Sequence, residues 1–164
     1  MAIQLTKTKD LTRQETYKLV ITQVQHLVSD ESNLIANLAN VSSLLKNTFE
    51  DYLWVGFYLT ANDNSEELVL GPFQGRPACT RIKFGKGVCG TSASLKQTII
   101  VDDVDQFPGH IVCDSFSKSE IVVPIVSNGI VRAVLDVDSD RLTNFNETDR
   151  RYLEEIVKIL APLF

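Results

Sequence analysis

The order of hydrophobic and polar residues predicts that the chain begins with a pair of helices. Across residues 12–28, apolar side chains recur at every third or fourth position, which is typical of one buried helix face. A second helix is expected to run to about Thr48, with Ser29 or Asp30 as the cap at its start.

After this pair of helices the pattern changes to a period near two, which indicates strands. Residues 52–59, YLWVGFYL, are rich in aromatic and branched side chains and predict a strand. Residues 62–65, NDNS, predict a turn, and residues 66–73 predict the returning strand of a hairpin.

The centre of the chain, residues 74–119, is irregular and holds most of the glycines. Within it we expect a short helix at residues 88–95 and a strand at residues 97–104. A long loop should then cover residues 105–117. Because functional side chains are often carried on loops that a rigid sheet supports, this segment is the first place to look for chemistry.

The last part of the chain predicts a hairpin and a closing helix. Residues 119–140 form two apolar runs that meet at Asn128-Gly129, a strong signal for a tight turn. A helix should follow over residues 146–160. The whole order predicts a single α+β domain over residues 1–164, with about 1–11 as an N-terminal extension. Its antiparallel sheet should carry helices mainly on one face.

Composition and charge exclude several classes of function. The chain has 164 residues, a net charge of −5 and no basic cluster, so nucleic acid is a poor partner. It has neither the apolar segment of a signal peptide nor an apolar stretch long enough to span a membrane. We therefore expect a cytoplasmic protein.

Three cysteines, Cys79, Cys89 and Cys113, lie in the irregular centre. Structural disulfides are rare in a reducing compartment, and three is an odd number of cysteines. One explanation is therefore that all three are small apolar side chains packed in the core. A Cys3His zinc site with His110 is a second, although gaps of ten and twenty-four residues contain no closely spaced pair. Thiol redox chemistry is a third, because it needs an attacking thiolate and a second thiol to form a disulfide.

Carboxylates gather at the far end of the predicted hairpin. Asp136 and Asp138 are two positions apart and share one strand face, which leaves Leu135 and Val137 for the core. Glu120 begins the partner strand at the same end. The three carboxyl groups form either a solvated acidic surface or a pocket for an ammonium group in which crowding keeps one carboxyl protonated.

An aromatic face completes the candidate chemistry. Trp54, Gly56 and Tyr58 alternate along one side of the predicted strand. Rings on either side of a glycine leave a gap that suits a small ligand or a cation, and core packing is the alternative.

Three segments together, residues 71–92, 101–125 and 129–140, resemble the free methionine-(R)-sulfoxide reductases, a family of stand-alone GAF domains. The resemblance extends over most of the chain and leaves out only the first ten or so residues. It implies thiol-dependent reduction of free L-methionine-(R)-S-oxide to L-methionine. No metal or organic cofactor is implied, and a homodimer through the N-terminal helices is expected.

The resemblance also implies a role for each candidate residue. Cys113 matches the nucleophile that becomes a sulfenic acid, and Cys79 matches the main resolving thiol that forms a disulfide with it. Cys89 is the third family cysteine, able to resolve or relay, and thioredoxin is the expected reductant. The matches to the substrate pocket are Trp54, Tyr58, Glu120, Asp136 and Asp138. The alternative is a GAF sensor module that binds a small ligand without catalysis; the absence of an attached output domain weighs against it.

Overall fold

The computed structural model describes residues 10–61 and 66–164, so the predicted turn at residues 62–65 and most of the expected N-terminal extension lie outside the described part. The helices of this part are α1 (Arg13–Ser29), α2 (Leu34–Thr48), α3 (Gly87–Leu95), α4 (Glu147–Leu160) and the short 3-10 helices η1 (Val104–Gln106) and η2 (Ala161–Leu163). The strands are β1 (Trp54–Thr60), β2 (Glu67–Gln74), β3 (Arg81–Lys83), β4 (Ile99–Val101), β5 (Ser119–Ser127) and β6 (Ile130–Ser139).

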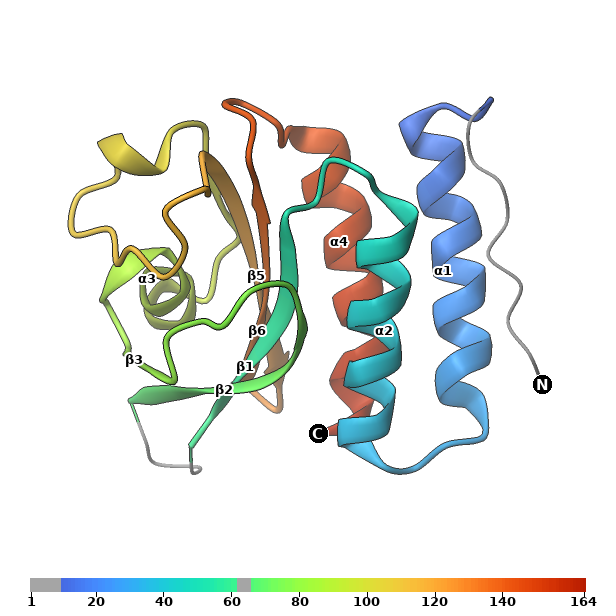
Figure 1. Ribbon diagram of the computed structural model, residues 1–164. Coiled ribbons are helices and arrows are strands. Elements are labelled where there is room, and N and C mark those ends of the chain that lie inside the picture. The colour runs from blue at the N-terminus through green and yellow to red at the C-terminus, as the bar shows by residue number, and fades with distance from the viewer. Residues whose placement is uncertain (1–9, 62–65) are drawn as a thin grey trace.

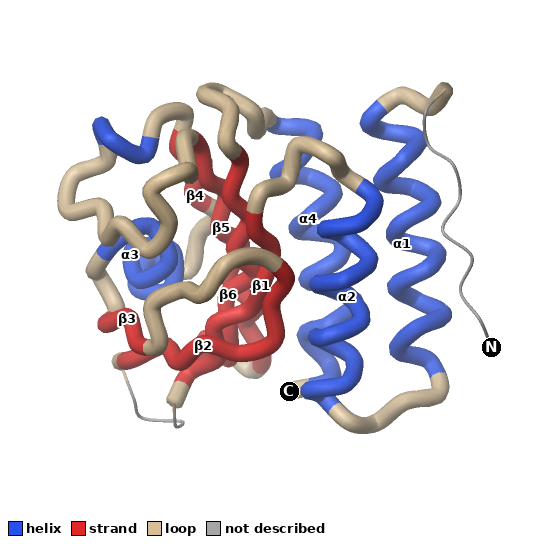
Figure 2. The backbone as a smooth tube through the Cα atoms, viewed as in Figure 1, coloured by secondary structure: helices blue, strands red, loops and turns tan. Residues whose placement is uncertain are grey.

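The strands form one six-stranded sheet in the order β3-β2-β1-β6-β5-β4, and every neighbouring pair is antiparallel. Helices α2 and α4 cover one face, and α1 lies outside them as a further layer (Figure 1). On the opposite face lie α3 and the long loops (Figure 2). The predicted α+β architecture, with the helices mainly on one face, is confirmed.

Strict alternation along the two central strands separates two cores. Val55 and Phe57 of β1, like Leu135 and Val137 of β6, belong to the apolar cluster beneath the helices. Trp54 and Tyr58 belong to a second cluster on the side of α3. The predicted assignment of strand faces is therefore correct, and it leaves the even-numbered positions of β6 for the α3 side.

The second helix begins later than predicted, and neither Ser29 nor Asp30 caps it. Its N-cap is Asn33, whose side chain accepts a 3.0 Å hydrogen bond from the backbone N–H of Ala36. Asp30 instead ends α1, while the Ser29 hydroxyl donates to the His26 carbonyl at 3.0 Å. Ser29 completes the preceding helix, which explains why its capping signal was misassigned.

Two differences in the centre of the chain concern short strands. The strand predicted over residues 97–104 is reduced to β4, because Asp103 accepts a 3.0 Å hydrogen bond from the N–H of Asp105 and turns the chain into η1. Strand β3 was not predicted, since three residues are too few to show an alternating pattern. It pairs with the outer edge of β2.

A polar network far from α3 fixes α1 to α4. Nε of Arg13 lies 2.5 Å from Oδ1 of the fully buried Asp149, and its Nη1 lies 2.7 Å from Oδ2 of Asp51. The Tyr17 hydroxyl donates a 2.8 Å hydrogen bond to the same oxygen of Asp149. The charge of Asp149 is thus compensated inside the helical layer. Among the described residues, no helix has the length and apolarity needed to cross a membrane.

Candidate active site

A small pocket lies on the α3 side of the sheet. Its cavity offers about 40 Å³ to the centres of water-sized molecules. The sequence-predicted residues that line it are Trp54, Tyr58, Cys89, Cys113, Glu120, Asp136 and Asp138. One pocket therefore unites side chains that are separated by more than eighty positions in the sequence.

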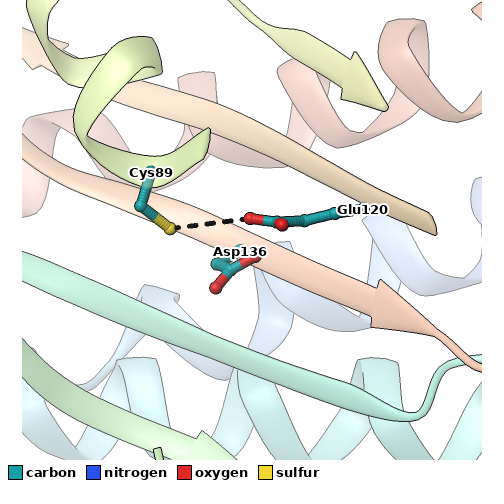
Figure 3. Close-up of side chains that lie close together, drawn as sticks. All are labelled: Cys89, Glu120 and Asp136. Carbon is teal, nitrogen blue, oxygen red and sulfur yellow. Dashed lines mark hydrogen bonds between the residues drawn. The ribbon is translucent and has the colours of Figure 1, made fainter. Parts of the chain in front are cut away.

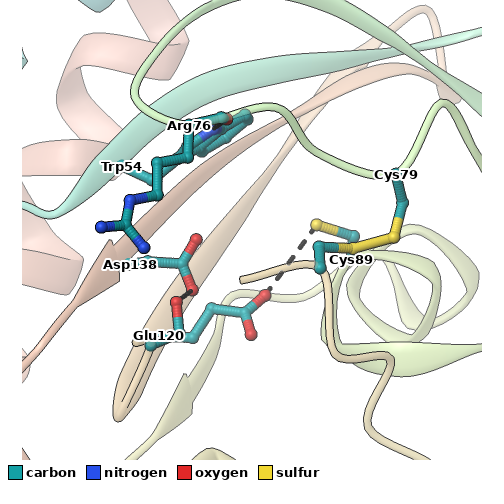
Figure 4. The surroundings of a disulfide bond; sticks show 8 residues. Trp54, Arg76, Cys79, Cys89, Glu120 and Asp138 are labelled. Atoms are coloured by element: carbon teal, nitrogen blue, oxygen red, sulfur yellow. Dashed lines mark hydrogen bonds between the residues drawn. A yellow bond between two sulfur atoms is a disulfide. The ribbon is translucent and has the colours of Figure 1, made fainter. Parts of the chain in front are cut away.

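Cys79, the remaining predicted residue, is joined to Cys113 by a disulfide. The two Cα atoms lie 5.4 Å apart, and the bond links the loop after β2 to the loop before β5. Both cysteines are partly exposed. Figure 4 shows the disulfide next to Cys89, with Glu120 and Asp138 on the strands beside it. The bond therefore lies at the boundary between the pocket and solvent.

Cys89 differs from the other two cysteines because it is free and only 3% exposed. Its Sγ lies 4.0 Å from Oε1 of Glu120 (Figure 3). Burial, with nearby Asp136 and Glu120, raises the pKa of the Cys89 thiol well above its ordinary value. Gly90, the next residue, lets α3 pack closely against β3, because a Cβ at this position would lie 2.2 Å from the Lys83 carbonyl oxygen. This close packing positions Cys89 over the sheet.

The predicted carboxylates share the pocket floor. Glu120 on β5 lies directly opposite Asp138 on β6, and Asp136 is on the same face of β6. Burial and the charges of their neighbours raise the pKa of Glu120 and of Asp136 well above the usual range. Burial also raises the pKa of Asp138, to about 6, against the opposing effect of a hydrogen bond from Ser117. The floor of the pocket can therefore retain protons near neutral pH.

An irregularity in the hairpin makes this arrangement possible. Ser127 pairs with Ile130 next to the turn, and the register shifts between Ile125 and Val126. Without that bulge, Glu120 would lie opposite Val137, whose side chain faces the helices, and directly opposed residues of an antiparallel pair point to the same side. By absorbing one extra residue of β6, the bulge keeps Glu120 opposite Asp138 on the pocket side of the sheet. The predicted proximity of the carboxylates is correct, but the sequence did not reveal that it depends on a bulge.

The aromatic wall depends on Gly56. The Trp54 ring stacks on Phe73 and Tyr58 with centroid separations of 5.3 and 6.0 Å, and its Nε1 donates a 3.0 Å hydrogen bond to the Arg76 carbonyl. A Cβ on Gly56 would lie 2.3 Å from the Trp54 ring. Gly56, which lies opposite Asp136 on β6, therefore leaves room for the Trp54 ring to lie along the strand.

Four further residues in or beside the pocket were not among the candidate site residues chosen from the sequence. Ser117 is buried and donates a 2.6 Å hydrogen bond to Oδ1 of Asp138. Nη1 of Arg76 lies 3.8 Å from Oδ1 of Asp114, and its guanidinium lies 4.0 Å from the centroid of the Phe116 ring. Several serines precede Glu120 in the sequence, and nothing in their order distinguishes the one that turns inward.

The zinc alternative does not match the observed arrangement. His110 lines the pocket, and burial lowers its pKa, which favours the neutral imidazole. Two of the three thiols that such a site needs are consumed in the Cys79–Cys113 disulfide. A Cys3His set is therefore not formed in this state of the chain.

Comparison with known proteins identifies the family. Residues 37–163 match the family described as GAF domain. The chain is 43% identical to the free methionine-R-sulfoxide reductase of Saccharomyces cerevisiae, over 92% of this chain and 87% of that protein. It is 53% identical to GAF domain-containing protein A of Dictyostelium discoideum, over 90% of this chain and 92% of that protein.

Solved structures agree with the sequence comparison. The free methionine-R-sulfoxide reductase of Neisseria meningitidis, determined in complex with its substrate, superimposes with a TM-score of 0.92 at 47% identity. That similarity covers 99% of this chain and 95% of the other. These relationships and the cysteine-bearing pocket show that the chain belongs to the free methionine-R-sulfoxide reductases, a family of GAF-domain oxidoreductases.

Proposed function

We propose that this chain reduces free L-methionine-(R)-S-oxide to L-methionine, with Cys113 as the nucleophile and Cys79 as the resolving thiol. The observation that carries the proposal is the position of the Cys79–Cys113 disulfide at the edge of a pocket floored by protonatable carboxyl groups. Thiol-dependent reduction requires two cysteines that can bond in this way, whereas ligand binding alone does not require them.

The pocket supplies separate contacts for the two ends of a sulfoxide amino acid. A carboxylate among Glu120, Asp136 and Asp138 holds the α-ammonium group, and the rings of Trp54 and Tyr58 contact the methyl and sulfur atoms. Ile111, Cys113 and Ser117 form part of the pocket lining, so the substrate contacts the loop that carries the nucleophile.

The chemical step transfers one oxygen atom from the substrate to Cys113. The Cys113 thiolate attacks the sulfoxide sulfur, and a protonated carboxyl, Glu120 or Asp138, donates its proton to the sulfoxide oxygen. The raised pKa values of these two groups favour the protonated form that a donor needs. Methionine leaves with its sulfur reduced, and Cys113 is oxidised to a sulfenic acid.

The second step regenerates the enzyme. The Cys79 thiol condenses with the Cys113 sulfenic acid, which releases water and forms the disulfide. An external dithiol, for which thioredoxin is the candidate, then reduces this bond. Cys79 suits the resolving role better than Cys89, because the raised pKa of the buried Cys89 thiol disfavours its reactive thiolate.

Thiol counting during a single turnover tests the proposal. One equivalent of free methionine-R-sulfoxide should remove two thiols per reduced chain and produce one methionine. Cys113→Ser should lose turnover by at least a thousandfold, whereas Cys79→Ser should complete the first reduction and then fail to cycle with thioredoxin. Ser115→Ala, an exposed change in the same loop, is the matched control.

Two results would contradict the assignment. Full activity of Cys113→Ser would show that Cys113 is not the nucleophile. Normal cycling of Cys79→Ser would assign the resolving role to Cys89. Binding of the sulfoxide without any loss of thiols would favour the sensor function instead.

The homodimer and the cytoplasmic location stay predictions. Helix α1 is the outermost layer of the fold (Figure 1). Its Leu19 side chain is exposed, which is compatible with pairing through the N-terminal helices. Light scattering of the purified chain tests the dimer, since a monomeric mass at micromolar concentration would contradict it.

A further inference from the structure

Three ligand-bearing side chains meet at the base of the pocket. Cys89 from α3, Glu120 from β5 and Asp136 from β6 are all buried, and one potential ligand atom from each lies within 4.8 Å of the other two (Figure 3). The proposed redox cycle uses the carboxyl groups for the substrate and assigns no step to Cys89. The proposed reaction therefore does not explain why a thiol lies beside these two carboxyl groups.

A second observation points to a missing ligand. Asp136 is 6% exposed, and its Oδ1 is buried without a hydrogen-bond partner. Leaving a buried polar atom unsatisfied costs free energy, and a cation bound in the cluster would supply the missing interaction. Asp136 and Cys89 line the same pocket.

We propose that Cys89, Glu120 and Asp136 form a binding site for a thiophilic divalent cation, Zn²⁺ above all, and that the bound ion blocks the substrate pocket. One thiolate and two carboxylates together carry three negative charges, so the site holding a divalent ion has a net charge of −1. Thiolate ligation favours zinc over magnesium or calcium, which prefer oxygen ligands alone. Binding releases the thiol proton and any proton held by the two carboxyl groups.

The distance between Cys89 and Glu120 allows both to coordinate one ion after a small movement. Tetrahedral zinc, with bonds of about 2.3 Å to sulfur and about 2.0 Å to oxygen, places sulfur and oxygen about 3.5 Å apart. Cys89 Sγ and Glu120 Oε1 are now 4.0 Å apart, so a shift of about half an ångström along the flexible Glu120 side chain is enough. The fourth position would be left to water.

The functional consequence rests on the proposed function. Glu120 and Asp136 are among the carboxyl groups proposed to contact the substrate, so a bound metal and methionine sulfoxide compete for the pocket. In this proposal, Cys89 is the thiolate ligand that makes the pocket sensitive to zinc.

The disulfide state provides a direct test of the site, because Cys89 is then the free thiol of the chain. Cobalt(II) serves as the probe, since its bond to a thiolate produces a near-ultraviolet charge-transfer absorption. The oxidised wild-type protein should develop this absorption with one Co²⁺ per chain, and one equivalent of Zn²⁺ should abolish it. Absence of the absorption at saturating Co²⁺ would overturn the site without reference to any variant.

Single substitutions then identify the ligands. Cys89→Ser should abolish the charge-transfer absorption, and Glu120→Gln or Asp136→Asn should each weaken metal binding at least tenfold. Asp114→Asn is the matched control, since Asp114 lines the pocket but lies outside the cluster. An equal loss of affinity with Asp114→Asn would overturn the assignment.

A kinetic experiment tests the competition separately. Reduced protein is mixed with methionine-R-sulfoxide without an added dithiol, because dithiols bind zinc. Zn²⁺ should slow the loss of thiols at least tenfold, and excess sulfoxide should restore the rate. If Zn²⁺ binds without slowing the loss of thiols, the claim that the ion blocks the substrate pocket is wrong. If metal-free protein does not turn over, the proposed function is contradicted, and the cobalt experiment alone tests the metal site.

Discussion

The Ser117 hydroxyl donates a 2.6 Å hydrogen bond to Oδ1 of Asp138 inside the pocket. This bond favours the ionised carboxylate, while burial favours the protonated form and raises the pKa to about 6. Burial and the Ser117 hydrogen bond therefore act on the pKa of Asp138 in opposite directions. The hydrogen bond can be removed by substituting Ser117 with little change in volume.

Ser117→Ala should raise the pKa of Asp138 further, by roughly half a unit to one unit, because a hydrogen bond to the charged form is lost. A proton donor acts while protonated, so its rate falls as the pH rises through its pKa. If Asp138 is the donor, the alkaline limb of the single-turnover rate should move to higher pH by the same amount. Ser115→Ala should leave the limb in place, and an unmoved limb in Ser117→Ala would assign the donor role to Glu120.

Glu120→Gln should stabilise the oxidised protein at pH 8 by about 1–3 kcal/mol relative to its effect at pH 4. The pKa of Glu120 is raised in the folded state by burial and by Asp136, so the folded protein retains a proton that the unfolded chain loses. Wild-type stability therefore falls as the pH rises from the ordinary glutamate value of 4.5 towards that raised pKa. Urea denaturation at both pH values measures the difference, with the exposed Glu155→Gln as control. A difference independent of pH would contradict the raised pKa.

Gly56→Ala should displace the Trp54 ring, since the new Cβ would lie 2.3 Å from it. We expect a loss of about 1–3 kcal/mol in stability and at least a tenfold rise in the sulfoxide concentration needed for half-maximal rate. Gly129→Ala is a useful contrast, because that glycine has a φ of +76° and open space around its Cβ position. It should cost stability through the backbone and leave the sulfoxide dependence unchanged; a similar loss of affinity in both variants would refute the role given to Gly56.

Arg13→Ala should destabilise the protein by about 3–5 kcal/mol, because it leaves the fully buried Asp149 without its cation. The substitution lies on the helical side of the sheet, so thiol loss per turnover should stay at two in the folded protein. Denaturant unfolding measures the cost. Arg151→Ala, an exposed change on α4, should cost less than about 1 kcal/mol, and an equally small effect of Arg13→Ala would show that Asp149 is compensated by other groups.

Much of the fold followed from repeated local patterns. Repeated spacing of apolar side chains identified α1, β1 and β6, because the same signal recurs at several positions. The dipeptide Asn128-Gly129 is a strong turn signal by itself. Strand β3 and the Asn33 cap were missed because a short edge strand and a choice among neighbouring caps depend on tertiary contacts. The candidate residues were selected from local patterns, and the family resemblance then implied a role for each. The burial of Cys89 and the inward turn of Ser117 depend on packing that no single segment encodes.

The bulge in the β5–β6 hairpin separates the length of the turn end from the register of the pocket. Deleting one residue of β6 between the turn and Ala133 would remove the bulge and leave Glu120 opposite Asp138, because every pair from Ile125–Ala133 onward is kept. Deleting one residue between Ala133 and Asp138 would instead move the rest of β6 to the opposite face of the sheet and take Asp138 away from Glu120. A one-residue change in length should therefore be tolerated beside the turn and rejected beside the pocket.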